Sequence, residues 1–335
     1  MLRSPIESEA VWLADDMAET SDWTLRLSPE QCSEVVAAAR AVDRRGATTA
    51  SLTHADFDLR TLRADVAALT HTLGTGRGFV LIRGFPVADL SDRQVELAYV
   101  GFGLQLGWPV SQNAAGDLLG HVRDEGVSRA DPSVRLYQTT ERQDFHTDGA
   151  DLVGLLCLHT ARRGGQSRIA SAAAIYNRML NERPDLVEVL YEPMYWDRNG
   201  EERAGEDPFF AMPVLNDIGG FPRMFFIGWY IRDAQRHAAV PRLTSEQQEA
   251  IEMIEQIANH DSVHLKMNFE PGDIQLLSNA RILHCREAYE DHDEPERRRH
   301  LLRLWLAAHS FASVDHVLRG GIPQRDHQPT VAEGS

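Results

Sequence analysis

The first third of the chain spaces its apolar residues as helices do and brackets them with helix-start and helix-stop signals. Two segments open with serine followed three residues later by glutamine, which is the pattern of a capping box, and glycines follow the last apolar residues. A short apolar run between glycines is typical of a buried strand instead. The pattern therefore predicts helices over 28–46, 59–73 and 91–107, and a strand over 79–82.

From about residue 118 the pattern changes to short strands separated by turns. Apolar and polar residues alternate most clearly at 263–269, where a period of two predicts a strand with one buried face. Helical spacing returns at 174–191 and in a segment that Thr244 caps. The predicted strands are 118–123, 134–138, 152–158, 168–172, 224–231, 263–269, 274–277 and 299–307.

This order of elements bears on the fold class. Many short strands with added helices, rather than regular alternation of strand and helix, favour a mixed β fold built on a double-sheet jelly roll over a doubly wound sheet. We expect one domain over 27–310, with an insertion at about 192–243 that is rich in glycine, proline and aromatic residues. Residues 1–26 are expected to form a partly ordered N-terminal arm, and 311–335 a C-terminal tail.

Composition and charge exclude several classes of protein. Hydrophobic residues make up 43% and charged residues 25%, as in a folded soluble chain. Asp and Glu number 50 against 34 Lys and Arg, and the formal charge of −16 argues against nucleic acid or an anionic membrane as partner. The three cysteines are widely spaced and predict no disulfide framework. Without a secretory signal or an apolar run near the ~18 residues of a membrane span, we expect a cytoplasmic protein with a small-molecule substrate. A homo-oligomer is neither indicated nor excluded.

The segment His146-Thr147-Asp148 is the first candidate for chemistry. Successive side chains of a strand point to opposite faces, so His146 and Asp148 share one side. A second imidazole from His284 would complete two histidines and one carboxylate, the facial set of non-heme Fe(II) oxygenases, which leaves open positions on the metal. With 14 histidines in the chain, such a triplet also arises by chance, and a hydrogen-bonded pair without metal is the alternative.

Two further signals accompany this triplet. Arg299 and Arg303 lie about 13 Å apart on one face of a predicted strand. Guanidiniums inside a protein require anions, and arginine suits bidentate recognition of a carboxylate. The alternative is that both point outward or pair with the acidic residues of 290–296. Gly164-Gly165-Gln166-Ser167 brings a hydroxyl to the start of a strand, although two glycines also make an ordinary hairpin turn.

In this order, the motifs resemble the taurine dioxygenase-like (TauD/TfdA) family of Fe(II)/2-oxoglutarate-dependent oxygenases, in the clavaminate synthase-like superfamily. They are His146–Gly149, Gly164–Ser167, Gly272–His284 and Arg299–Arg303. Residues 78–85 are similar to an early strand of that family, so the resemblance covers roughly 78–308. It implies a double-stranded β-helix core, with Fe(II), 2-oxoglutarate and O2 as cofactor and cosubstrates.

The resemblance also implies roles for single residues. Arg299 would pair with the distal carboxylate of 2-oxoglutarate, helped by the Ser167 hydroxyl, where many members have threonine. Arg303 matches a position that meets the anionic group of the substrate in taurine dioxygenase, but it could equally brace Arg299 or the cosubstrate. The iron ligands would be His146, Asp148 and His284.

The reaction implied is hydroxylation of an unactivated C–H bond in a small polar or anionic molecule, while 2-oxoglutarate and O2 become succinate and CO2. Asp148 argues against halogenation, because related halogenases have a small residue there. Desaturation or ring closure at the same iron centre is one alternative. A zinc hydrolase or a metal-binding jelly-roll protein is another, but a hydrolase would leave Arg299 and Ser167 without a role.

Weaker candidates lie outside these motifs. Asn113 and His121 fall where family members build a substrate pocket, and ordinary loop hydrogen bonds are the alternative. Trp229 and Tyr230, in the predicted insertion, could form a lid or a pocket wall, although aromatic residues more often belong to the core.

Overall fold

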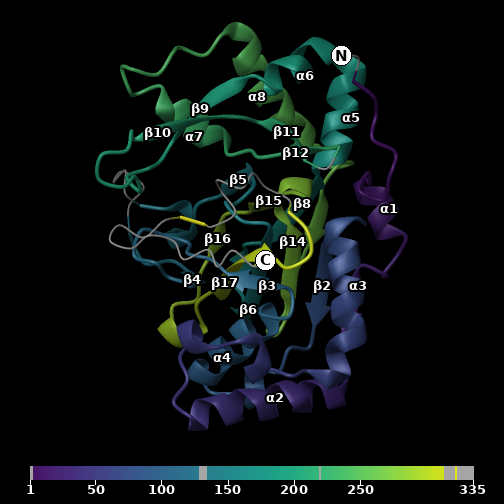
Figure 1. The fold of residues 1–335 in the computed structure, drawn as a ribbon, viewed down its shortest axis with the longest axis vertical. Coiled ribbons are helices and arrows are strands. Elements are labelled where there is room, and N and C mark those ends of the chain that lie inside the picture. The colour runs from purple at the N-terminus through teal and green to yellow at the C-terminus, as the bar shows by residue number, and fades with distance from the viewer. Residues whose placement is uncertain (1–2, 128–133, 219, 313–320, 323–335) are drawn as a thin grey trace.

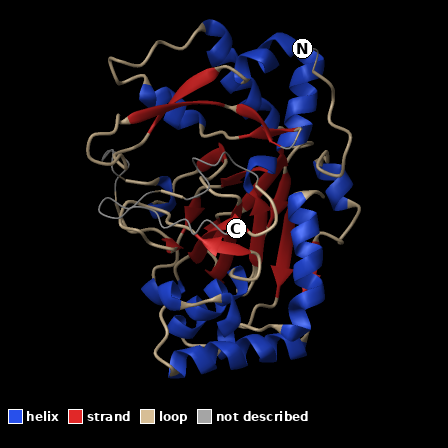
Figure 2. Cartoon of the chain, in the orientation of Figure 1, coloured by secondary structure: helices blue, strands red, loops and turns tan. Residues whose placement is uncertain are grey.

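Two β-sheets lie face to face in the middle of the molecule, between groups of helices (Figure 1, Figure 2). The structure is a computed structural model that describes residues 3–127, 134–218, 220–312 and 321–322. The helices are α1 (Ala14–Ala18), α2 (Pro29–Arg44), α3 (Arg63–Gly74), α4 (Asp92–Gly103), α5 (Ala172–Glu182), α6 (Pro184–Leu190), α7 (Gly228–Ala234) and α8 (Ser245–Ala258). The strands are β1 (Thr24–Arg26), β2 (Phe79–Arg83), β3 (Gly107–Pro109), β4 (Leu119–Val122), β5 (Gln143–His146), β6 (Leu152–His159), β7 (Arg163–Gly164), β8 (Ser167–Ser171), β9 (Pro193–Asp197), β10 (Phe209–Pro213), β11 (Leu215–Ile218), β12 (Phe221–Met224), β13 (Leu265–Met267), β14 (Ile274–Ser278), β15 (Ile282–Arg286), β16 (Tyr289–Glu290) and β17 (His300–Ala308).

The larger sheet contains seven strands of the described residues, in the order β1-β2-β14-β6-β17-β3, and β4 also pairs with β17. Among these described strands, only the pair β1–β2 is parallel. The central strands are almost wholly buried and rich in aliphatic residues, which is why their apolar runs predicted strands at 79–82, 152–158, 274–277 and 299–307.

The smaller sheet has the order β13-β8-β15-β5. Strand β15 pairs antiparallel with both neighbours, so that His284 lies opposite His146 on one side and Ile169 on the other. Further along, Arg286 lies opposite Gln143 and Ser167, after an irregularity in the pairing with β5. The sheet therefore brings together segments that are far apart in the sequence.

Apolar side chains fill part of the space between the sheets. Phe79, Val153 and Leu277 enter this layer from the larger sheet, and Ile169 and Ile282 from the smaller one. Because side chains alternate between the faces of a strand, the residues next to these point to the outer faces, where the helices lie.

Two apolar clusters attach the helices to those outer faces. Helices α2, α3 and α4 share one cluster with Leu302, Leu304 and Leu306 of β17. Helices α5 to α8 share another with Leu283 and Cys285 of β15. The outward-facing side chains of β15 and β17 pack against the helices. The inward-facing positions of these two strands are therefore the ones that can carry polar side chains.

Three helices begin where capping predicted them to begin. The N-cap side chains of α2, α4 and α8 each accept a hydrogen bond from a backbone N–H three residues later, and each glutamine returns the bond. The caps are Ser28, Ser91 and Thr244.

The segment before residue 27 packs along the domain more closely than a partly ordered arm would. Trp12 is buried, with its ring centroid 5.0 Å from that of Phe79, and residues 24–26 form strand β1 of the larger sheet. The predicted tail 311–335 lies outside the described residues except for 311, 312, 321 and 322. Within the described ranges, no helix has the length and apolar character needed to cross a membrane.

Three predicted elements were wrong. Residues 134–138 are not a strand, because the Gln138 side chain accepts the Arg135 N–H and closes a 3-10 turn over 136–138. The helix over 174–191 is two helices, because Pro184 lacks an N–H and can only start a new one, α6. The strand over 224–231 ends at Met224, since the following apolar run winds into α7 and buries Ile231 in the helical cluster. Short apolar runs do not distinguish strand from buried helix.

Candidate active site

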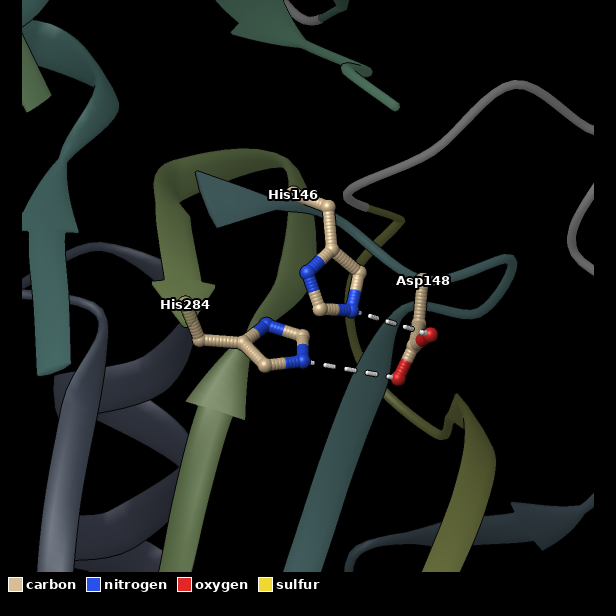
Figure 3. Close-up of side chains that lie close together, drawn as sticks. All are labelled: His146, Asp148 and His284. Atoms are coloured by element: carbon tan, nitrogen blue, oxygen red, sulfur yellow. Dashed lines mark ion pairs between the residues drawn. The ribbon is translucent and has the colours of Figure 1, made fainter. Parts of the chain in front are cut away.

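The two histidines and the aspartate of the metal-site prediction converge beside β5 and β15 (Figure 3). One donor atom from each side chain lies within 4.8 Å of the other two, and all three residues are buried. Nε2 of His146 is 3.9 Å from Oδ1 of Asp148, and Nε2 of His284 is 3.7 Å from Oδ2. Both imidazoles therefore turn the same nitrogen toward the carboxylate.

Hydrogen bonding fixes the proton on His146. Its Nδ1 is 2.8 Å from the backbone oxygen of Asp144, and a carbonyl can only accept, so Nδ1 carries the proton. Nε2 keeps its lone pair and points to the space shared with Asp148. This arrangement, with the second nitrogen held by a backbone carbonyl, is the one found for metal-binding histidines.

The backbone and the carboxylate of Asp148 are held by different residues. Asn279 accepts the Asp148 N–H at 2.8 Å and donates to the backbone oxygens of Asp148 and Ala150, which fixes the turn after β5. From β17, the Trp305 indole N–H donates to Oδ2 at 3.1 Å. The position of Asp148 thus depends on Trp305 of the larger sheet and on Asn279, in the turn between β14 and β15.

Burial and charge set the protonation of the three groups. Burial, followed by the neighbouring His146, lowers the pKa of His284 to about 3, and burial also lowers the pKa of His146. Burial acts to raise the pKa of Asp148, but Arg303 and the two histidines outweigh it, so that this pKa falls below its ordinary value. Neutral imidazoles and an ionised carboxylate are the forms that bind a metal ion.

A pocket lined by His146 and His284 also contains Arg299 and Ser167, the two residues predicted to bind the distal carboxylate of 2-oxoglutarate. Arg299 is 4% exposed, and its Nη1 has no hydrogen-bond partner among the described residues. Gly165, in the predicted glycine turn, lies so close that an added Cβ would be 3.0 Å from Nε of Arg299. The Ser167 hydroxyl exchanges hydrogen bonds with the Gln275 amide of β14.

Arg303 also lines the pocket but has partners of its own. Its Nη1 is 3.5 Å from Oδ1 of Asp148, and its Nε donates to Oε1 of Gln112 at 2.7 Å. The guanidinium carbon lies 4.8 Å and 4.7 Å from the ring centroids of Tyr137 and Trp305. From the sequence, Arg303 could pair with the acidic 290–296 loop or brace Arg299. Among the described residues, Arg303 forms neither an ion pair with that loop nor a hydrogen bond with Arg299.

Several pocket residues were missed by the sequence analysis. Arg286 is the most prominent, because it is buried, lines the pocket and stands two residues after His284 on β15. That spacing places both on the same face of the strand, and this signal could have found it. Gln143 and Tyr137 gave no comparable signal, because their place in the pocket depends on contacts between segments that are far apart in the sequence.

The structure does not bring Asn113 and His121 into the pocket. The Asn113 side chain bonds to Asp117 and to nearby backbone N–H groups, which closes its own loop. His121 lies on β4, with Nδ1 2.9 Å from Nε2 of His300. Both residues therefore make ordinary hydrogen bonds, which was the alternative interpretation of these two positions in the sequence.

Trp229 reaches the site from helix α7 of the predicted insertion. Its ring centroid is 5.1 Å from that of His146, in an edge-on contact. The neighbouring Tyr230 instead lies over Arg135, 5.6 Å from its guanidinium carbon. The backbone N–H of Phe226 donates to the Thr147 hydroxyl at 2.9 Å, which fixes the insertion to the turn after β5.

The family model described as taurine catabolism dioxygenase TauD, TfdA family matches residues 44–305. FR-33289 synthase of Streptomyces rubellomurinus is 33% identical over 313 residues, which cover 91% of each chain. Taurine hydroxylase-like protein SAT17 of Stachybotrys chartarum is 30% identical over 316 residues, 90% of this chain and 80% of that protein.

The fold is similar to that of a solved oxygenase. Asparagine oxygenase in complex with Fe(II), 2S,3S-3-hydroxyasparagine and succinate superposes with a TM-score of 0.66 at 17% identity, over 85% of this chain and 93% of that one. The resemblance drawn from the motifs therefore extends to the mixed helix-and-sheet fold and to most of the sequence. The chain belongs to the TauD/TfdA family of iron- and 2-oxoglutarate-dependent dioxygenases.

Proposed function

We propose that this chain hydroxylates an unactivated C–H bond of a small polar or anionic molecule, at an iron bound by His146, Asp148 and His284. The observation that carries the proposal is the convergence of these three buried side chains within 4.8 Å, at the edge of a pocket that contains a buried arginine. We further propose that the two sheets form a double-stranded β-helix core within one domain over 27–310.

The residues present fit the iron. Two neutral imidazoles and one carboxylate make the facial donor set of non-heme Fe(II) sites. Nδ1 of His146 has its backbone partner, and Nε2 of both histidines and the carboxylate face a common space. Trp305 would hold the carboxylate, and Asn279 would hold the backbone of Asp148, through the hydrogen bonds described above.

The residues present also fit 2-oxoglutarate. Arg299 is buried, and its Nη1 has no partner in the described part of the chain. A buried cationic donor without an acceptor is costly, so an anion is needed there. In our proposal, Arg299 and the Ser167 hydroxyl bind the distal carboxylate of the cosubstrate, while the oxo-acid end reaches the iron. Iron(II) and 2-oxoglutarate, once bound, supply with O2 the oxidising power that breaks a C–H bond, and succinate and CO2 are the co-products.

The chain itself supplies orientation and exclusion of water. Trp229 would form a wall of the substrate space beside His146, and the Thr147–Phe226 hydrogen bonds would keep that wall in place. Arg303 would orient Asp148 and present positive charge to an anionic substrate. The complex of asparagine oxygenase with a hydroxylated amino acid supports hydroxylation of a small polar molecule over desaturation or ring closure.

The test is a titration of anaerobic protein and Fe(II) with 2-oxoglutarate, followed by the visible charge-transfer band of the chelate. We expect a band in the wild type and none in His284→Ala. Metal binding without a band would instead favour a zinc hydrolase or a metal-binding jelly-roll protein, and would refute the proposal.

A further inference from the structure

We propose that Arg286 is a second arginine for the distal carboxylate of 2-oxoglutarate, acting beside Arg299 and Ser167. This inference rests on the proposed function, because it assumes that 2-oxoglutarate binds in the pocket. It adds a residue that neither the motifs nor the resemblance assigned. The ligand class is a dicarboxylic 2-oxo acid, and Arg286 would contact the carboxylate far from the oxo group.

The pairing of the strands places Arg286 beside the two residues already proposed. On β15 it lies directly opposite Ser167 of β8, so the two side chains stand on the same face of the sheet. Arg286 and Arg299 also share one aromatic ring, since the guanidinium carbon of each lies 5.1 Å from the ring centroid of Tyr289. All three residues line the same pocket.

The guanidinium of Arg286 is anchored on one edge and unsatisfied on the other. Nη2 donates to the backbone oxygen of Leu136 at 3.3 Å and to that of Glu141. Nε and Nη1 have no hydrogen-bond partner among the described residues, although Arg286 is only 6% exposed. A guanidinium that is held in place and has two unpaired N–H donors is arranged to bind a carboxylate.

No protein carboxylate takes this place in the described part of the chain. Neither Arg286 nor Arg299 forms an ion pair there, whereas Arg303 pairs with Asp148 and Arg168 with Glu287 at 2.9 Å. Two buried cations without a counter-anion repel each other and lose hydration, so the free pocket is electrostatically unfavourable. One carboxylate between them would satisfy the donors of both.

The experiment compares two oxo acids that differ in the distal carboxylate. Dissociation constants of 2-oxoglutarate and 2-oxobutyrate are measured with anaerobic Fe(II)-loaded protein from the charge-transfer band, for the wild type and for Arg286→Gln. We expect Arg286→Gln to weaken 2-oxoglutarate about 10- to 100-fold, the range for hydrogen bonds to a charged group, and to leave 2-oxobutyrate unchanged. Arg286→Lys, which keeps the charge but loses the planar fork, should fall between them.

Arg168→Gln is the matched control, because it removes an arginine next to Ser167 whose partner is Glu287 on the protein. It should change neither dissociation constant. An equal loss for both oxo acids in Arg286→Gln would mean that Arg286 only supports the loop at 136–141, and an unchanged 2-oxoglutarate constant would mean that it plays no part. Either result overturns the inference while the band of the wild type upholds the proposed function. Absence of a band in the wild type would refute both.

Discussion

At the scale of single residues, the site depends on positions where a small side chain or one hydrogen bond keeps a larger group in place. Gly165 is one of them. Its φ of +70° suits glycine, and a Cβ there would approach Nε of Arg299 to 3.0 Å. Gly165 is thus more than part of a turn, because it makes room for the buried guanidinium.

We predict that Gly165→Ala weakens 2-oxoglutarate binding, because the new methyl group displaces Arg299. Gly200→Ala is the matched control: Gly200 has a φ of +77° but nothing within 4 Å of an added Cβ. Both substitutions should lower the free energy of unfolding by about 1–2 kcal/mol for the left-handed backbone. Only Gly165→Ala should raise the KM for 2-oxoglutarate, and equal KM values in the two variants would contradict this account.

A single hydrogen bond from Trp305 gives a second prediction at this scale. Trp305→Phe keeps an aromatic ring but removes the donor to Oδ2 of Asp148. We expect metal affinity to fall about 10- to 100-fold, as for the loss of other groups that orient a metal ligand. Anaerobic Fe(II) titration measures it, with Trp108→Phe as control, since Trp108 is 56% exposed. Unchanged affinity would show that Arg303 and Asn279 suffice to orient the carboxylate.

At the scale of secondary-structure elements, the site is built where the predicted insertion meets β5. The hydroxyl of Thr147 accepts the N–H of Phe226 at 2.9 Å, and the N–H of Thr147 donates to the oxygen of Phe226 at 2.7 Å. His146 forms an isolated bridge with Ile227. These bonds hold α7, and with it Trp229, against the site.

Thr147→Val should test this attachment. The substitution keeps the shape of the side chain but leaves the buried N–H of Phe226 without its partner, which costs about 1–3 kcal/mol. We expect that loss in the free energy of unfolding from urea denaturation, together with a larger KM for the substrate. Thr147→Ser retains the hydroxyl and should lose less. If valine and serine variants behave alike, the hydroxyl does not hold the insertion.

At the scale of the whole molecule, the proposed ligands connect parts of the fold that are distant in sequence. His146 ends β5 and Asp148 follows it, whereas His284 lies on β15, and the two strands are neighbours only in the folded sheet. A metal ion should therefore bind the native state and not the unfolded chain. Binding to the native state alone stabilises a protein by about 2.7 kcal/mol at a ligand concentration 100 times Kd.

We therefore predict that Mn(II), a substitute that is not readily oxidised, raises the melting temperature of the wild type and that chelator reverses the change. His284→Ala should show no such rise in melting temperature. Its two remaining ligands lie on one short segment, so the metal would bind the folded and the unfolded chain about equally. A similar rise in His284→Ala would place the stabilising metal elsewhere on this acidic molecule.

Local sequence determined the elements whose signals are local. The capping boxes at 28–31, 91–94 and 244–247 begin helices because a side chain and a backbone N–H three residues away satisfy each other without outside help. The alternation over 299–307 placed Arg299 and Arg303 on one face of a strand, but it left open whether that face was buried. The break at Pro184 was also readable, since its backbone chemistry is local.

Only the tertiary structure decided which of these faces meet. The contact of Trp305 and Arg303 with Asp148, the support from Asn279, and the place of Arg286 opposite Ser167 all depend on pairing and packing between distant strands. The same packing took Asn113 and His121 away from the pocket and wound 228–234 into a helix. Sequence periodicity determines which side of an element is buried, but the partner across the core is fixed by the free energy of the whole fold.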